Sequence, residues 1–415
     1  MKKIEIINTD ELIYYEKLEN GLEVYMLPNN NIKKYAISFF TKFGSIHTSF
    51  KSNNNKYTVP NGIAHFLEHK VFEQKNGIDP FTFFSKSGTD CNAYTAYNYT
   101  NYILDGTTNL NKNINYLLDY VQSPNFTNEN VEKEKGIIKQ ELLSYKDYYE
   151  YLSFDNLMSN IFINSNYKYT VGGEVEDIEK ITKNMLYDCY NAFYNPNNMI
   201  IVITGNFNKD KIIEIIKNNQ MNKVFNNYKY EIQSIDEPDK VLKEFDKLTI
   251  GVSIPILNIG IKIKKEDNIK DKLYLLIIVD YLFGKTSKFV EKLIEDNIIE
   301  GRLKSNIVDA DTHDVILLEC KSYKYEETIK RVKSLLNNFE IDNVFFERRK
   351  KVSICKYIEC FEYINKINFE IVDYLIEYGK YPYDYYEIIK SLDYKELCDI
   401  KNRLCFDNMS SYVID

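Results

Sequence analysis

Two histidines and a glutamate occur within five residues, in the run His65-Phe66-Leu67-Glu68-His69. On a helix, side chains at positions i, i+3 and i+4 lie on one face, so these three groups would project together. Two neutral imidazoles one turn apart can hold a divalent metal ion, and a carboxylate between them can accept a proton from water. The run therefore predicts a metal site that activates water.

The sequence around this motif favours a helix. Val59-Pro60-Asn61-Gly62 indicates a turn, and no helix breaker interrupts the apolar residues from Ile63 to Phe72. We expect a half-buried helix from about Asn61 to Glu73. A simpler interpretation is two surface histidines on an amphipathic helix. With only 4 His among 415 residues, however, chance would produce the motif in roughly 0.003 places.

A zinc site needs a third protein ligand, which must be Asp, Glu, Cys or His. His47 and His313, the other two histidines, have no companion pattern. Residues 127–143 are a better source, because a capping threonine and early acidic residues indicate a helix there. Glu134 and Glu141 would project on the same side, so one can bind metal and the other can support a ligand. From this segment alone, ordinary solvated charges on a lysine-rich helix are the simpler interpretation of both glutamates.

The motif and its flanks, residues 59–73, together with residues 132–141, resemble the pitrilysin or insulinase family of zinc metallopeptidases. In this inverzincin pattern H-x-x-E-H replaces the more common H-E-x-x-H. The likeness is to the short bacterial, processing-peptidase-like subunits, and it extends from about Leu22 to Phe207.

The resemblance implies a role for each residue of the site and one zinc ion per chain. The metal ligands would be His65, His69 and Glu141, the catalytic base would be Glu68, and Glu134 would support the ligands from behind. It also implies a peptide as substrate, hydrolysed at a peptide bond.

A second part of the resemblance concerns substrate binding. Residues 88–102 resemble the family strand that pairs with bound peptide, and residues 99–104 alternate in strand fashion. An extended peptide beside an open strand gains main-chain hydrogen bonds with little demand on its side chains. Asn92 and Ala93 would then line the binding cleft, although the residues alone fit an ordinary half-buried strand equally well.

Strands followed by helices occur twice along the chain, which indicates an α+β fold. The expected strands lie at 22–28, 34–43, 200–204, around 307 and at 315–320, with a further strand region at 248–264. The expected helices lie at 113–150, 177–194, 272–283 and from 325 to the end. We expect a catalytic half at 1–222, a polar linker at 223–243 and a metal-free half at 244–415. The resemblance implies two tandem halves of similar fold, each a mostly antiparallel sheet covered by helices, facing each other across a cleft.

Composition restricts the partners and the compartment. A net charge of −8 and a pI near 5.4 argue against nucleic acid. No apolar stretch is long enough to span a membrane, and the N-terminus becomes polar too early for a signal peptide. Seven cysteines without C-x-x-C spacing favour reduced thiols. We expect a soluble, cytoplasmic protein.

The second half suggests that the chain acts with a partner. In self-sufficient relatives a Tyr and an Arg of the second half hold the scissile carbonyl. Here Arg302 is present without a Tyr at a matching offset. A related subunit lacking H-x-x-E-H, forming a heterodimer, or a second copy of this chain, forming a homodimer, would supply the missing group.

Two alternatives concern the function. The chain could be a non-catalytic scaffold or partner subunit of a peptidase complex, although such subunits usually have a broken motif. If it is a peptidase, it could carry out general peptide turnover or remove leader peptides from modified precursors, and the sequence is compatible with both.

Overall fold

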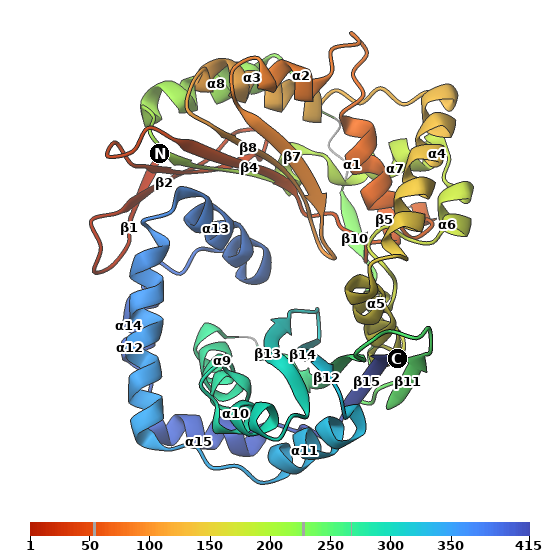
Figure 1. Cartoon of the computed structure of the whole chain (residues 1–415). Helices are drawn as coiled ribbons and strands as arrows, with labels where there is room; N and C mark the ends of the chain where they lie inside the picture. Colours follow the sequence, from red (N-terminus) through yellow and green to blue (C-terminus); the bar gives the residue numbers. More distant parts are fainter. Residues whose placement is uncertain (53–54, 226–228, 267) are drawn as a thin grey trace. The chain divides into compact units, whose positions relative to one another are not determined.

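The computed structural model describes residues 1–52, 55–225, 229–266 and 268–415 (Figure 1). The chain forms two compact units, and neither is a continuous stretch of sequence. The first unit comprises Met1–Leu142, Thr170–Ser234 and Lys356–Tyr385, and the second comprises Leu143–Tyr169, Ile235–Cys355 and Tyr386–Asp415.

A seven-stranded sheet forms the centre of the first unit. Its strands are β1 (Lys2–Glu5), β2 (Leu12–Lys17), β3 (Glu23–Pro28), β4 (Tyr35–Thr41), β7 (Asp90–Thr95), β8 (Thr100–Gly106) and β9 (Met199–Gly205). They lie in the order β1-β2-β3-β9-β4-β8-β7, and all neighbours are antiparallel except β3 and β9. Strands β4 and β9 are buried along their whole length, which explains their nearly continuous apolar sequences.

Helices cover both faces of this sheet. Those of the first unit are α1 (Ile63–Val71), α2 (Pro80–Ser85), α3 (Leu110–Val121), most of α4 (Asn128–Tyr145), α6 (Val175–Lys180), α7 (Lys183–Phe193), α8 (Lys209–Met221) and α13 (Ile364–Tyr378). Figure 1 shows α3 and α8 on one face and α13 on the other. A small sheet, β10-β5-β6, adds Tyr230–Ile232, Ser49–Ser52 and Asn55–Thr58.

The second unit contains a five-stranded sheet. Its strands are β11 (Phe245–Leu248), β12 (Ile256–Lys264), β13 (Ile299–Val308), β14 (His313–Ser322) and β15 (Met409–Ile414), in the order β11-β15-β12-β14-β13. Its helices are α5 (Tyr149–Ile161), α9 (Ile269–Phe283), α10 (Lys288–Glu295), α11 (Tyr325–Asn337), most of α12 (Asn343–Cys360), most of α14 (Tyr385–Lys390) and α15 (Tyr394–Arg403). The α+β class, with two halves that each carry an antiparallel-rich sheet, is confirmed.

The compact units do not follow the expected boundaries at 222 and 244. Helix α5 packs on β12 and β15 of the second unit, and α13 packs on β4 and β9 of the first. Each half of the sequence therefore gives one helix to the sheet of the other half. The division of the chain into a catalytic half at 1–222, a linker at 223–243 and a second half at 244–415 stays a prediction.

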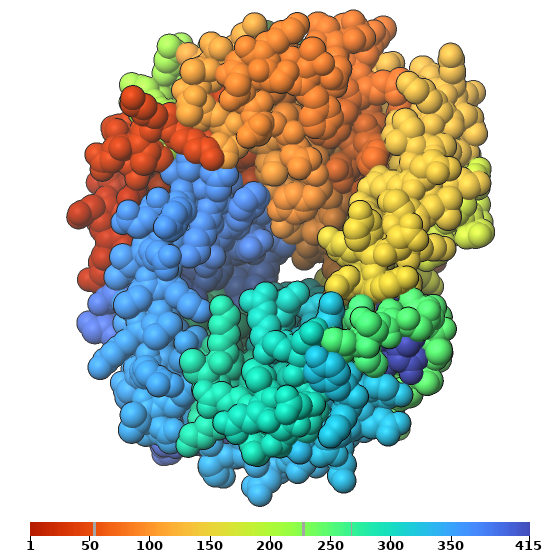
Figure 2. Space-filling model, viewed as in Figure 1, coloured from red at the N-terminus to blue at the C-terminus, as the bar shows by residue number. Residues whose placement is uncertain are grey.

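One expectation for the second half was wrong. The chain ends in the buried strand β15 and not in a helix, and β15 pairs with β11 in parallel and with β12 antiparallel. Figure 2 shows the dark-blue C-terminal residues among green residues of this unit. Strand β15 has the sequence MSSYVI, and six residues are too few for periodicity to distinguish a strand from a helix. The strand region expected over 248–264 contains the end of β11 and all of β12, and the chain turns between them at 249–255, where Gly251 has a φ of +83°.

Within the described ranges, no helix is both long enough and apolar enough to cross a membrane. The seven cysteines are all unpaired. The cytoplasmic location stays a prediction.

Candidate metal centre

Helix α1 carries both histidines of the motif and begins at Ile63, two residues later than expected. Its N-cap is Gly62, whose φ of +79° is a left-handed conformation that glycine adopts without strain. A Cβ at this position would lie 2.2 Å from the carbonyl oxygen of Gly172. Glycine therefore allows α1 to begin directly against the turn at Gly172 and Gly173.

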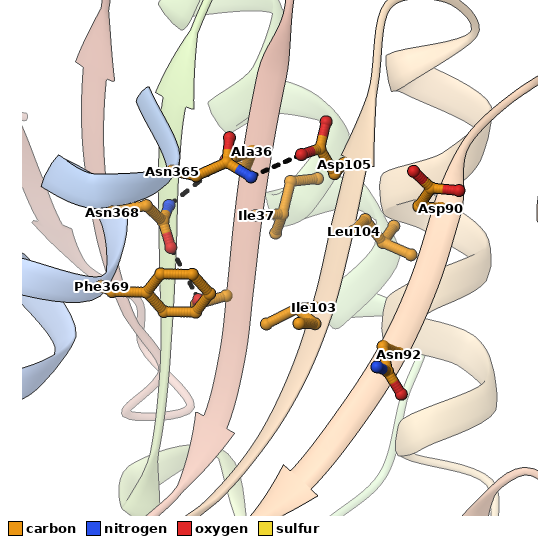
Figure 3. Close-up of a pocket in the computed structure, with 11 residues that line it drawn as sticks. Ala36, Ile37, Asp90, Asn92, Ile103, Leu104, Asp105, Asn365, Asn368 and Phe369 are labelled. Carbon is orange, nitrogen blue, oxygen red and sulfur yellow. Dashed lines mark hydrogen bonds between the residues drawn. The ribbon is translucent and has the colours of Figure 1, made fainter. Parts of the chain in front are cut away.

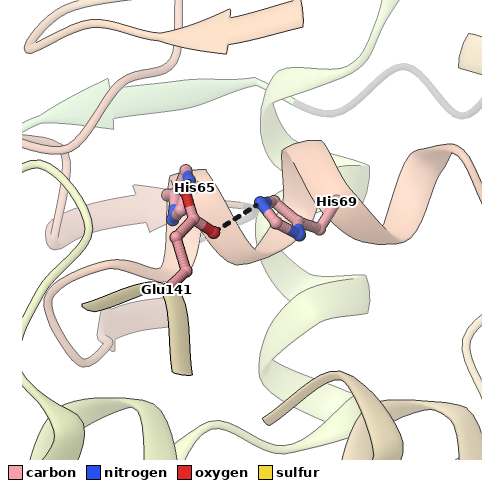
Figure 4. A group of neighbouring side chains, drawn as sticks. All are labelled: His65, His69 and Glu141. Carbon is pink, nitrogen blue, oxygen red and sulfur yellow. Dashed lines mark ion pairs between the residues drawn. The ribbon is translucent and has the colours of Figure 1, made fainter. Parts of the chain in front are cut away.

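His65, His69 and Glu141 converge, with Glu141 supplied by α4 (Figure 4). The Nε2 atom of His65 lies 3.8 Å from Glu141 Oε1, and the Nε2 atom of His69 lies 3.4 Å from Glu141 Oε2. Ligands about 2.05 Å from a tetrahedral zinc ion are separated by about 3.3 Å. Two nitrogens and one carboxylate at these distances could hold a zinc ion, which would polarise a bound water molecule.

The two histidines have different electrostatic environments. Burial, followed by the neighbouring His69, lowers the pKa of His65 to about 4. Burial would also lower the pKa of His69, but the hydrogen bond with Glu134 and the carboxylates of Glu68 and Glu141 raise it above its ordinary value. Without metal, His65 is therefore neutral near pH 7, whereas His69 tends to keep its proton.

Glu134 holds His69 from the side opposite to Glu141. The Nδ1 of His69 lies 3.1 Å from Glu134 Oε1, and an ionised carboxylate can only accept, so Nδ1 carries the hydrogen and Nε2 is left to bind metal. Burial raises the pKa of Glu134, but His69 and the nearby Lys70 lower it below its ordinary value. Lys70 is fully buried, lies 3.8 Å from Glu134 Oε2 and donates to the carbonyl oxygen of Asn130.

Glu68 points toward strand β7. The hydroxyl of Thr95 donates to Glu68 Oε2 at 2.6 Å. Burial raises the pKa of Glu68 above its ordinary value, and the hydrogen bond from Thr95 partly opposes this shift. A buried carboxylate whose pKa is raised binds a proton more readily than an exposed glutamate does, which suits a general base.

Comparison with known proteins assigns the family. The family model described as "Insulinase (Peptidase family M16)" matches residues 31–174, and the model described as "Peptidase M16 inactive domain" matches residues 180–340. The chain belongs to the M16 peptidase family. The resemblance of the motif and its flanks to insulinase-type peptidases is thereby confirmed.

Individual relatives agree with this assignment. The M16 chain is 36% identical over 308 residues to YmfH of Bacillus subtilis, described as an uncharacterized zinc protease, covering 72% of each chain. It is 28% identical over 204 residues to the mitochondrial-processing peptidase subunit beta of Caenorhabditis elegans, covering 48% of this chain and 42% of that one. The crystal structure of an M16-like peptidase from Alicyclobacillus acidocaldarius matches with a TM-score of 0.94 and 28% identity over 99% of each chain.

Asn92 and Ala93, expected to bind substrate, lie on β7 at one edge of the seven-stranded sheet. The main-chain N–H of Ala96 donates to the carbonyl oxygen of Tyr99. In an antiparallel pair only every second residue forms main-chain hydrogen bonds with the partner strand, so counting back from Ala96 identifies the residues of β7 that do not. Cys91, Ala93 and Thr95 consequently point their main-chain N–H and C=O groups away from β8. The N–H of Ala93 accordingly donates to the side-chain oxygen of Asn92 at 2.9 Å and not to β8.

The side chains of Asn92 and Ala93 lie on opposite faces of β7. Ala93 packs against the hydrophobic core, whereas Asn92 is exposed. The main chain of Ala93 and the side chain of Asn92 are therefore the groups available at this edge.

The sequence interpretation gave no role in the site to Thr95, Lys70 or Gly172. Thr95 lies within the stretch that resembles the substrate strand, and Lys70 directly follows the motif. Lys70 could have been identified from the sequence, because a lysine among the apolar residues of a helix indicates a buried cation that requires acceptors. Arg302, the candidate carbonyl-binding residue, is exposed on β13 of the second unit.

Replacing Gly172 with alanine is expected to displace the residues that hold the metal ligands His65 and Glu141. The added Cβ would lie 2.6 Å from Leu142 Cδ2, next to Glu141, and 3.6 Å from His65 Nδ1. We expect the Gly172→Ala chain to lose about 1–3 kcal/mol of stability by overpacking and to bind zinc more weakly. Urea unfolding and chelator competition measure the two effects.

Gly136→Ala is the matched control, because Gly136 lies on α4 and a Cβ added there would meet no atom within 4 Å. Alanine in a helix interior should stabilise this variant by about 0.5–1 kcal/mol. Equal zinc affinity and stability in the two variants would show that the contact between Gly172 and Leu142 does not matter.

Proposed function

We propose that this chain is a zinc-dependent peptidase that hydrolyses peptides bound in extended form. The observation that carries the proposal is the convergence of His65, His69 and Glu141 beside Glu68. Membership of the M16 family and similarity to a relative described as a zinc protease support it at the level of the family.

Each polar group of the site has a role in this proposal. When bound by His65, His69 and Glu141, zinc would lower the pKa of a water molecule and polarise the scissile carbonyl. Glu68 takes the proton of the attacking water and passes it to the leaving amine. The hydroxyl of Thr95 orients Glu68, and both groups lie within hydrogen-bond distance.

Strand β7 would hold the substrate. Its outer edge presents the N–H and C=O groups of Cys91, Ala93 and Thr95, and Thr95 contacts the proposed base directly. A peptide paired with this edge would extend past Glu68 while gaining main-chain hydrogen bonds. The side chain of Asn92, which now accepts from the Ala93 N–H, would have to leave that position when a peptide binds.

Zinc affinity is expected to fall in acid solution. Metal must displace the proton of His69, whose pKa is raised, whereas His65 is already neutral at pH 6. The zinc dissociation constant should therefore rise about tenfold per pH unit below the pKa of His69 and level off above it. Chelator competition between pH 5.5 and 8 measures this profile.

Glu134→Gln provides the test of the cause. Without the negative charge of Glu134, the pKa of His69 falls and the transition moves to lower pH. An unchanged transition would mean that another group controls the pH dependence.

We also propose that a partner completes the active site. The second half matches a family model described as an inactive domain, and one relative is named as a subunit. A related chain without H-x-x-E-H would give a heterodimer, and a second copy would give a homodimer. Either would provide the carbonyl-binding Tyr for which the sequence shows no match at the expected offset from Arg302.

The test combines metal analysis with peptide cleavage. The purified chain should contain one zinc ion and cleave an N-acetylated, unstructured peptide, with a higher rate after addition of a related chain that lacks the motif, or at concentrations where the chain dimerises. Full activity in a demonstrably monomeric sample would contradict the partner proposal. A chain without zinc that cleaves nothing in any mixture would contradict the peptidase proposal and favour a scaffold.

A further inference from the structure

A pocket lies on the α13 face of the seven-stranded sheet, beside the outer strand β7 (Figure 3). Its empty volume is about 330 Å³, counted with the part open to solvent. Ala36, Ile103 and the ring of Phe369 form apolar walls. Strands β4 and β8 and helix α13 supply these residues, so the pocket is built entirely within the first unit.

Strand β7 supplies the polar rim of the pocket. Cys91 and Ala93 pack toward the hydrophobic core, and Thr95 contacts Glu68 on α1, so these three side chains share one face. Side chains alternate along a strand, and Asp90 and Asn92 accordingly lie on the opposite face, where both line the pocket. Both are exposed.

The two carboxylates at the pocket differ in their partners. Asp105 is paired with Lys34 and accepts a hydrogen bond from Asn365 of α13, so its charge is already neutralised. Asp90 has no ion pair with any described residue. The pocket therefore combines apolar walls with one uncompensated negative charge at its rim.

We propose that this pocket is a subsite for a lysine or arginine side chain of the bound peptide. The apolar walls would contact the methylene stem, and Asp90 would pair with the charge at its end. The inference rests on the proposed function, because it requires a peptide paired with the edge of β7. A peptide in that position lies about 4.8 Å outside β7, so only a long side chain reaches across the strand into the pocket.

The position of the basic residue in the peptide follows from the strand geometry. Thr95 marks the catalytic base, and Asp90 and Asn92 lie five and three residues before it in the sequence. Every second side chain of a paired peptide points to the α13 face. The basic residue should therefore lie about three to five residues from the cleaved bond, always on the same side of it.

The first experiment measures binding to the full-length chain carrying Glu68→Gln, which prevents cleavage. The probes are N-acetylated, C-amidated 13-residue peptides of Ser, Ala and Val that contain one central Lys, Gln or Glu. Acetylation removes the terminal amine as a competing cation. The Lys peptide should bind about three- to fivefold more tightly than the Gln peptide, which is the range of an exposed ion pair.

Substitutions at Asp90 identify the pocket as the cause. Asp90→Asn should make the Lys and Gln peptides equal, and Asp90→Lys should make the Glu peptide the tightest. Asp10→Asn is the matched control, because it removes the same charge between β1 and β2, at the opposite edge of the sheet, and should keep the preference. Thermal unfolding checks that the variants fold, since Asp90 is exposed.

The second experiment uses the unsubstituted chain and maps cleaved bonds by mass spectrometry as Lys is moved along the peptide. The cut should follow the Lys at a constant spacing, and Asp90→Asn should abolish this relation. Equal binding of the three peptides, or a preference that survives Asp90→Asn, would overturn the subsite while leaving the peptidase proposal intact. Failure of the chain to bind any peptide, together with absence of cleavage in every mixture with a partner chain, would overturn both.

Discussion

Glu68→Gln is expected to abolish peptide hydrolysis while leaving zinc bound. Glutamine keeps the shape of the side chain and can accept the hydrogen bond from Thr95 through its amide oxygen. It cannot take a proton from water, so kcat should fall by about 10²- to 10⁴-fold. The metal ligands do not include Glu68, and zinc content should stay at one ion per chain.

The measurement pairs metal analysis with initial rates on one peptide. Glu132→Gln is a matched control, because Glu132 lies on α4 with its side chain 67% exposed, and its partner Lys135 also donates to the carbonyl oxygen of Glu179. This variant should retain both zinc and activity. If Glu68→Gln cleaves peptide at the normal rate, another group is the base, and loss of zinc in that variant would show that Glu68 supports the metal.

Glu141→Ala is expected to lose both zinc and activity. Its carboxylate is the only one in the described part of the chain that forms a three-residue metal-binding group with the two histidines. Glu134→Ala should weaken zinc binding by only about 10- to 100-fold, as the loss of a residue that orients a ligand typically does. The loss for Glu141→Ala should exceed that range, because a direct ligand is removed.

Chelator competition on the two variants distinguishes the roles. Glu141→Gln should lose zinc as Glu141→Ala does, because a neutral amide is a poor zinc ligand. The glutamine side chain keeps the size of the glutamate, so the packing of α4 is preserved. A larger loss of affinity in Glu134→Ala than in Glu141→Ala would reverse the assignment. Normal zinc content in Glu141→Ala would mean that a different residue is the third ligand.

Periodicity alone could not decide which of the two glutamates on α4 binds the metal. Glu134 and Glu141 are two helical turns apart, so periodicity places them on one side of α4 and does not distinguish them. The resemblance to insulinase-type peptidases proposed Glu141 as the ligand. Only the packing of α4 against α1 shows that Glu141 faces the Nε2 atoms while Glu134 contacts Nδ1 of His69.

For the strand expected to bind substrate, the sequence predicted the strand but not its position at the edge of the sheet. Alternation along residues 99–104 predicted β8, and the structure pairs it with β7 in a hairpin. Which strand lies at the edge of the sheet depends on the strand order, and that order includes β9, about a hundred residues later. The uncompensated charge of Asp90 and the wall from α13 likewise depend on residues distant in the sequence.

The sequence by itself determined the features that depend on neighbouring residues. These were the helix that presents His65, Glu68 and His69 on one face, the helix of the two candidate glutamates, and the alternation of strands and helices in an α+β fold. Only the tertiary structure decided which carboxylate meets the histidines, which strand has a free edge, and that α5 and α13 are exchanged between the two sheets. The physical reason is that helix and strand periodicity is set over a few residues, whereas burial of each sheet face is satisfied by whichever helix the whole chain brings to it.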